Sequence, residues 1–128
     1  MSTFLFAAAL VALQSVPAQS TPQAEAQPYV PPVALSAESN AALRCSAAFA
    51  LVSYGQANNN EAARQWPDLD ERGREFFVRT MAQIMDETGM GREDAARMAQ
   101  AEAQRLLESG EIDQVMPACL AMLDLSGL

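Results

Sequence analysis

The chain contains neither histidine nor lysine among its 128 residues, and these absences exclude much familiar chemistry. Histidine is the usual general base near neutral pH and the commonest zinc ligand, and it activates the nucleophile in Ser-His-Asp and Cys-His sites. We therefore predict no catalytic residues, no metal site and no cofactor, and we expect a protein that is not an enzyme.

Positive charge is also scarce. The eight basic residues are all arginine and stand against 16 acidic residues, which gives a formal net charge of -8. Proteins that bind nucleic acids or anionic lipid surfaces use clusters of basic side chains to meet the phosphates. The composition therefore argues against a nucleic-acid partner and against docking on an anionic membrane.

No long hydrophobic run is present, and the run over residues 4–13 is uncharged but short. A transmembrane helix needs about 20 apolar residues, whereas the h-region of a signal peptide needs only about 7 to 15. Small and β-branched residues follow at 16–18, as a signal peptidase requires. We predict a signal peptide over residues 1–18, cleaved after Ala18. An N-terminal membrane anchor that is never cleaved is the alternative.

Only two cysteines are present, Cys45 and Cys119, and both lie in the predicted mature chain. Export places them in an oxidising compartment, where two cysteines in a small domain favour one structural disulfide. A redox pair is the competing interpretation, but the C-x-x-C spacing typical of one is absent. We predict a Cys45–Cys119 disulfide and a periplasmic or secreted protein, assuming a Gram-negative source.

Proline is unevenly distributed, since five of the seven prolines lie within residues 17–32. Proline removes backbone donors and restricts the residue before it, and this stretch has few large apolar groups to bury. We expect a Pro-rich disordered linker over residues 19–35. The folded domain is expected over residues 36–128.

The start of this domain is rich in alanine and predicts a central helix. Ser36 is a suitable N-cap for a helix over residues 37–54, with Gly55 as its stop. Few of its side chains are strongly polar, as expected for a helix buried on nearly every side. A short helix over residues 61–66 follows, with Asn60 as its cap.

A long amphipathic helix comes next. Asp68 is the predicted cap, and the helix should run to Thr88, with Gly89 ending it. Gly73 interrupts its apolar face, where glycine costs about 1 kcal/mol of helix propensity relative to alanine. A close crossing between Gly73 and the alanine-rich first helix would explain this glycine.

Two further helices complete the prediction. Gly91 caps a helix over residues 92–109, and residues 111–116 should form a single turn. Pro117 is then placed at the first position of a last helix over residues 117–125. No segment alternates as a strand would. The predicted fold is all-α, a small bundle of four main helices plus a short helix, with one disulfide.

Methionine is abundant and suggests a binding surface. Methionine side chains fill gaps in cores but also line adaptable apolar grooves. Phe76, Phe77, Met81 and Met85 share one face of the long helix, and Trp66 is the only tryptophan. We take these five residues as a candidate apolar groove. Ordinary core packing is the competing interpretation.

Acidic residues occur in adjacent pairs, Asp86-Glu87 and Glu93-Asp94. Neighbours on a helix point about 100° apart, so that neither pair can flank one substrate bond. Several acids have an arginine three or four residues away, which is typical of a solvated helix face. The predicted pairs are Asp70–Arg74, Glu75–Arg79 and Glu93–Arg97.

Overall the mature chain resembles small exported all-helical proteins of Gram-negative bacteria with one cysteine near each end of the bundle. We predict a non-enzymatic binding or interaction module of the periplasm, whose partner is a protein or an apolar small molecule. No membrane association is expected after cleavage. Two alternatives stay open: a hydrolase that uses carboxylates and arginine, and a protein held at the membrane by its N-terminus.

Overall fold

The computed structural model describes residues 33–128 and folds this part of the chain into helices without any strand. The helices are α1 (Ala37–Ala57), α2 (Glu61–Arg64), α3 (Asp70–Thr88), α4 (Arg92–Ser109) and α5 (Ile112–Leu125). The predicted all-α class, with four main helices and a short one, is confirmed. The predicted signal peptide and residues 19–32 of the predicted linker lie outside the described residues.

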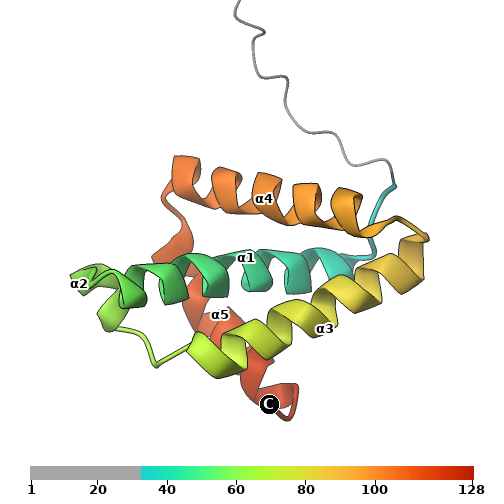
Figure 1. Cartoon of the computed structure of the whole chain (residues 1–128). Coiled ribbons are helices and arrows are strands. Elements are labelled where there is room, and N and C mark those ends of the chain that lie inside the picture. The colour runs from blue at the N-terminus through green and yellow to red at the C-terminus, as the bar shows by residue number, and fades with distance from the viewer. Residues whose placement is uncertain (1–32) are drawn as a thin grey trace, which may run out of the picture.

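Helix α1 lies at the centre of the fold. Helix α4 runs along one side of α1, α3 crosses it, and α5 passes behind it in the view of Figure 1. Ala47, Ala48 and Phe49, in the middle of α1, are at most 1% exposed. A helix that is apolar on nearly all sides is typically a buried one, packed among its neighbours. The predicted central position of this helix is therefore confirmed.

Short polar residues and glycines set the helix boundaries. The Ser36 hydroxyl accepts a hydrogen bond from the backbone N–H of Ser39, and the Asn60 side chain accepts one from Ala63. Each cap satisfies a backbone donor that the first turn of a helix leaves unpaired. Gly89 ends α3 with φ of +73°, in the left-handed region that favours glycine. These predicted caps and the predicted stop are confirmed.

Helix α1 does not end at Gly55, so that prediction is wrong. The helix continues to Ala57, and the turn after it places Asn59 at φ +60°. Gly55 serves another purpose, because a Cβ there would lie 2.7 Å from the Cβ of Ala63. The residue allows α2 to fold back closely against α1.

Pro117 does not begin a helix, and here too the prediction is wrong. Helix α5 starts at Ile112 and runs through Pro117 without a break. Proline inside a helix removes one backbone hydrogen bond and normally bends or breaks it. Met116 and Cys119 are at most 1% exposed, so both halves of α5 are packed into the core. This tertiary packing holds a single helix across the proline.

Boundaries elsewhere differ by a few residues. Helix α2 ends at Arg64 rather than at residue 66, and α3 begins at Asp70, one residue later than expected. Leu69 is the N-cap of α3 and has no side-chain capping bond. The Asp68 carboxylate nevertheless accepts a hydrogen bond from the Asp70 N–H at 3.0 Å. Asp68 therefore still satisfies a donor at the start of the helix.

Gly73 marks the point where α3 crosses α1. A Cβ at Gly73 would lie 3.3 Å from the Cβ of Phe49 on α1 and 3.2 Å from that of Leu69. One turn further on, the rings of Phe49 and Phe76 meet edge to face, with centroids 5.3 Å apart. The close crossing predicted from this glycine is confirmed.

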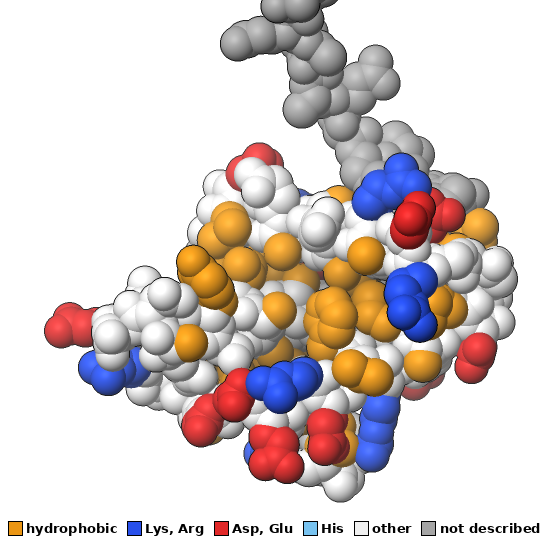
Figure 2. Space-filling model, in the orientation of Figure 1, with side chains coloured by type: hydrophobic (Ala, Val, Ile, Leu, Met, Phe, Trp, Pro, Cys, Tyr) orange, Lys and Arg blue, Asp and Glu red, His pale blue; other side chains and the backbone are white. Residues whose placement is uncertain are grey.

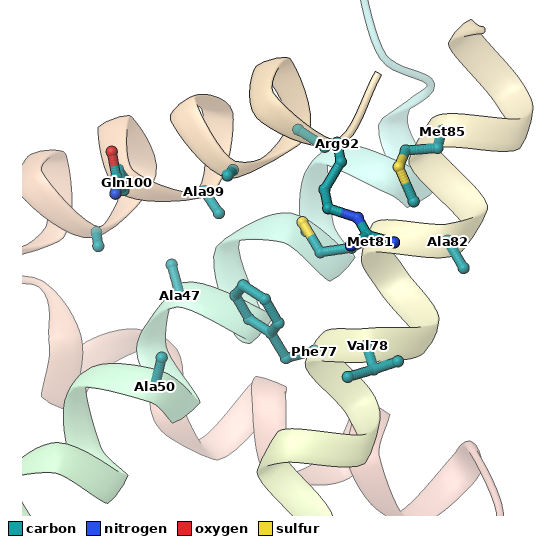
Figure 3. Close-up of a pocket in the computed structure, with 13 residues that line it drawn as sticks. Ala47, Ala50, Phe77, Val78, Met81, Ala82, Met85, Arg92, Ala99 and Gln100 are labelled. Carbon is teal, nitrogen blue, oxygen red and sulfur yellow. The ribbon is translucent and has the colours of Figure 1, made fainter. Parts of the chain in front are cut away.

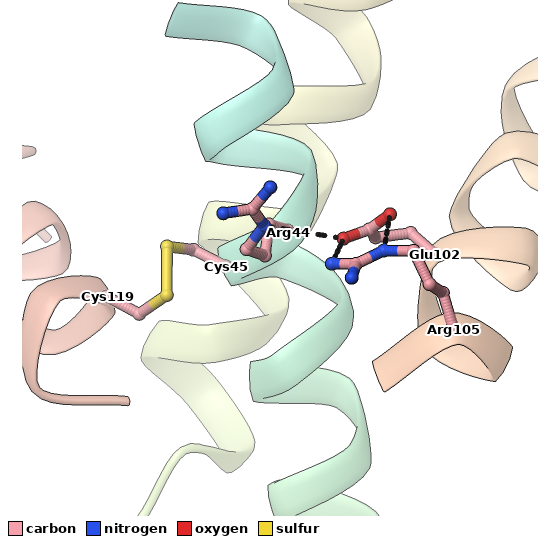
Figure 4. Close-up of a disulfide and its surroundings, with 5 residues drawn as sticks. All are labelled: Arg44, Cys45, Glu102, Arg105 and Cys119. Atoms are coloured by element: carbon pink, nitrogen blue, oxygen red, sulfur yellow. Dashed lines mark hydrogen bonds and ion pairs between the residues drawn. A yellow bond between two sulfur atoms is a disulfide. The ribbon is translucent and has the colours of Figure 1, made fainter. Parts of the chain in front are cut away.

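The Cys45–Cys119 disulfide joins α1 to α5 and is confirmed (Figure 4). The two residues are 74 positions apart in sequence, and their Cα atoms are 5.1 Å apart. An ion-pair cluster links α1 to α4 at the same level of the helix. The Glu102 carboxylate accepts from Arg105 at 2.7 Å and lies 3.6 Å from Arg44. Helix α1 is therefore covalently joined to one neighbour and paired through charges with another.

The segment between α2 and α3 is held by one side chain, Gln56. Its amide nitrogen donates to the carbonyl oxygens of Ala63, Trp66 and Pro67 at 2.9–3.1 Å. Its amide oxygen accepts from the N–H of Leu69 at 3.2 Å. No sequence pattern pointed to Gln56, which holds this segment by hydrogen bonding to backbone groups around Pro67.

Candidate functional site

A groove lies between α3 and α4, with α1 as its floor. The two helices meet at the turn around residues 89–91 and diverge away from it, leaving α1 visible between them (Figure 1). Side chains facing this gap are small, with Ala47 and Ala50 on α1 and Ala99 and Ala103 on α4. Because a methyl group cannot reach across the gap, a groove of about 620 Å³ remains open. Figure 2 shows it as an apolar hollow.

One wall of the groove carries the larger side chains. Phe77, Met81 and Met85 come from α3, at the spacing of successive turns, and each is half-buried (Figure 3). Val78 continues this wall and is 61% exposed. Unbranched methionine side chains adjust their shape at low cost. This wall can therefore adapt to an apolar group placed against it.

The groove contains a single charged side chain, Arg92, which extends from the start of α4 toward α3 (Figure 3). Gln100 is the only other side chain of the lining with a charged or amide group, and no carboxylate lines the groove. Within residues 33–128, Arg92 forms no ion pair and no hydrogen bond, whereas every other arginine has a partner. The partnered arginines are Arg44, Arg64, Arg72, Arg74, Arg79, Arg97 and Arg105.

The five residues proposed from the sequence do not lie in one groove. Phe77, Met81 and Met85 line it together. Phe76 points the other way and is only 6% exposed, packed against Phe49 in the core. Trp66 lies beside α2, where its indole N–H donates to Asp113 at 3.3 Å. Phe76, predicted to share a face with Phe77, Met81 and Met85, thus lies in the core instead.

The rest of the groove was not among the residues predicted from the sequence. Arg92 was noted only as the first residue of a helix. Ala95, Ala99 and Ala103 recur at four-residue spacing on α4 and line the groove. The sequence signal that could have indicated the groove is this row of alanines on α4 together with the alanine-rich helix α1. Whether such faces close completely depends on the angle between the helices, which the sequence does not give.

A second depression of about 600 Å³ lies at the other end of α1. Trp66 lines it together with two exposed side chains, Tyr54 at 72% and Leu107 at 55% exposure. Asp113 is its charged residue, and it already accepts hydrogen bonds from Trp66 and Gln65. This depression therefore has no unpaired charged group to direct a ligand.

One acidic side chain, Glu87, connects two helices. The Glu87 carboxylate, at the end of α3, accepts hydrogen bonds from the backbone N–H of Ser36 at 2.9 Å and from the Ser39 hydroxyl. The Ser39 hydroxyl, followed by the Ser36 N–H, lowers the pKa of Glu87 below its ordinary value. Glu87 thus acts as a tertiary cap on the N-terminus of α1 and fastens α1 to α3.

Predicted ion pairs along single helices are found in part. Asp70 pairs with Arg74 at 2.6 Å, as expected. Arg97 pairs at 2.8 Å with Asp94 instead of the expected Glu93, since both acids lie within one turn of it. Within residues 33–128 no three acidic or cysteine side chains gather as they would around a metal ion. In the same range no helix has the length and hydropathy to span a bilayer.

No family model, curated protein or solved structure matches the chain. Whether the groove suits a ligand, and of which kind, therefore has to be inferred from the groove itself. The relevant features are its volume, its apolar lining and the single unpaired guanidinium at its edge.

Proposed function

We propose that this protein is an exported, non-enzymatic binding module that holds an apolar small molecule in the groove between α1, α3 and α4. The single observation that carries the proposal is the groove itself, about 620 Å³ in volume and lined almost wholly by alanine, methionine, phenylalanine and valine. Ligand pockets of proteins are typically 300–1,000 Å³ and mostly apolar, with few polar groups. Binding of an apolar ligand to such a surface is favourable, because it removes apolar surface from water.

Export is supported by two independent features. The sequence predicts a cleaved signal peptide over residues 1–18, and Cys45 and Cys119 form a disulfide, a bond that persists mainly in oxidising compartments. Mass spectrometry of the native protein tests this part. We expect a mature chain that starts at Gln19 and a mass that rises by about 2 Da on reduction, one hydrogen for each cysteine. A native protein that retains residues 1–18, or whose thiols react before reduction, would contradict export.

Binding is tested with a neutral apolar fluorophore, N-phenyl-1-naphthylamine, titrated into the purified protein. Ala50 lies exposed on the floor of the groove, so that Ala50→Trp fills the groove without disturbing the core. Ala121 is exposed on α5 and lines no part of the groove, and Ala121→Trp is the matched control. We expect saturable binding that Ala50→Trp weakens at least about tenfold and Ala121→Trp leaves unchanged. Equal loss in both variants, or no binding to the wild type, refutes the proposal.

A further inference from the structure

We propose that the natural occupant is an amphiphile with one anionic head, a long-chain carboxylate, whose head pairs with Arg92 while its chain lies along the groove. This inference rests on the proposed function and adds the chemical class of the ligand. It starts from Arg92, the single charged residue of the lining. The guanidinium extends from the start of α4 toward the α3 wall (Figure 3).

The surroundings of Arg92 favour an anion. The chain has twice as many acidic as basic residues, and within residues 33–128 every arginine except Arg92 has a partner. The nearest acids in sequence are Glu93, whose side chain is exposed, and Asp94, which pairs with Arg97. A groove without a carboxylate therefore presents one uncompensated positive charge in a strongly negative protein.

The geometry of the groove favours an apolar chain behind that head. From Arg92 the lining continues along one face of α4 through Ala95, Ala99 and Ala103, a length of about 16 Å at 1.5 Å per residue. Phe77 and Met81 face this row from α3. The groove is therefore long and apolar, with its only charge at one end, which is the polarity of an amphiphile.

A carboxylate fits better than a phosphate. One guanidinium pairs with one carboxylate through two parallel hydrogen bonds, and the pair is then electrically neutral. A phosphate monoester carries up to two negative charges, and the second would meet no cation in this groove. The formal charge of -8 on the chain also disfavours additional negative charge.

Displacement of bound N-phenyl-1-naphthylamine compares dodecanoate with dodecanol, which has the same chain and no charge. An exposed ion pair contributes modestly, so we expect dodecanoate to bind about fivefold more tightly than dodecanol to the wild type. We expect this ratio to fall to about one in Arg92→Gln and to persist in Arg97→Gln, the matched control on the exposed side of α4. Shortening the carboxylate by one methylene should weaken binding about fourfold.

The outcomes separate the two proposals. If the neutral fluorophore binds but dodecanoate shows no advantage over dodecanol, the head-group assignment is wrong and the binding function stands. If the advantage survives in Arg92→Gln, the anion lies elsewhere and the assignment is equally wrong. If the fluorophore does not bind at all, the binding function fails as well. A stronger preference for dodecyl phosphate than for dodecanoate would replace the carboxylate with a phosphate head.

Discussion

Helix α1 is covered in two different ways on two of its sides. Toward α5 it meets Met116, Cys119 and Leu123, each at most 1% exposed, and it is joined there by the disulfide. Toward the groove between α3 and α4 it presents Ala50, which is exposed, whereas Ala47 beside it is at most 1% exposed. The side of α1 that faces α5, here called the stapled side because of its disulfide, and the side that faces the groove thus have different roles. The first holds the fold together, and the second leaves apolar surface available because stability is secured elsewhere.

The largest expected effect concerns the stapled side. A disulfide that closes a loop of 74 residues lowers the entropy of the unfolded chain, and the chain-entropy model gives about 4 kcal/mol of stabilisation. We expect the double variant Cys45→Ala/Cys119→Ala to lose about this much free energy of unfolding in urea titrations. Reduction of the wild type with dithiothreitol should give a similar loss. A loss of less than about 1 kcal/mol in the free energy of unfolding would mean that the fold does not depend on the disulfide.

A pair of truncations compares the two sides directly. Leu123 is fully buried on the side of α5 that faces α1. Leu123→Ala should lower the free energy of unfolding by about 3 kcal/mol, because it removes buried apolar surface and leaves a cavity. Met85 is only half-buried at the groove, so Met85→Ala should cost less than about 1 kcal/mol. Both values come from urea titrations of the oxidised protein. Comparable losses at the two positions would show that the groove wall belongs to the core.

The stapled side was largely accessible from the sequence, and the groove side was not. Cys45 and Cys119 allow only one pairing once export is inferred, and the caps at Ser36 and Asn60 follow from local backbone chemistry. The pairing depends only on the number of cysteines, and the caps depend only on neighbours within three positions. Pro117 misled for the same reason, since its local preference was overruled by packing of α5 against α1.

The groove depends on how helices are placed relative to each other. The spacing of Phe77, Met81 and Met85 defines a face of α3, but it does not reveal that the adjacent Phe76 enters the core while these residues line an opening. Arg92 became a candidate only when its lack of a partner was visible in three dimensions. Gln56 was equally hidden, because the four backbone groups that it contacts lie up to 13 residues further along the chain.

The smallest expected effect tests how the closed end of the groove is fastened. Glu87 joins α3 to the N-terminus of α1 through Ser36 and Ser39, and these bonds lower the pKa of its carboxyl group in the folded state. A group whose folded pKa is lowered stabilises the fold above its unfolded pKa, near 4.3, and this contribution is lost as the pH falls through the folded value. Stability at pH 7 should therefore be lower in Glu87→Gln than in the wild type.

The pH profile distinguishes this link from a general effect of charge. As the pH falls below about 4.3, the wild type should lose stability more steeply than Glu87→Gln, so that the two curves converge in acid. Asp86→Asn, which removes the same charge from an exposed neighbour on α3, is the matched control and should leave the wild-type profile in place. If Glu87→Gln and Asp86→Asn behave alike, helix α3 is held at this end by packing alone. The groove could then widen there without breaking a specific polar contact, and its volume would depend on the ligand rather than on the fold.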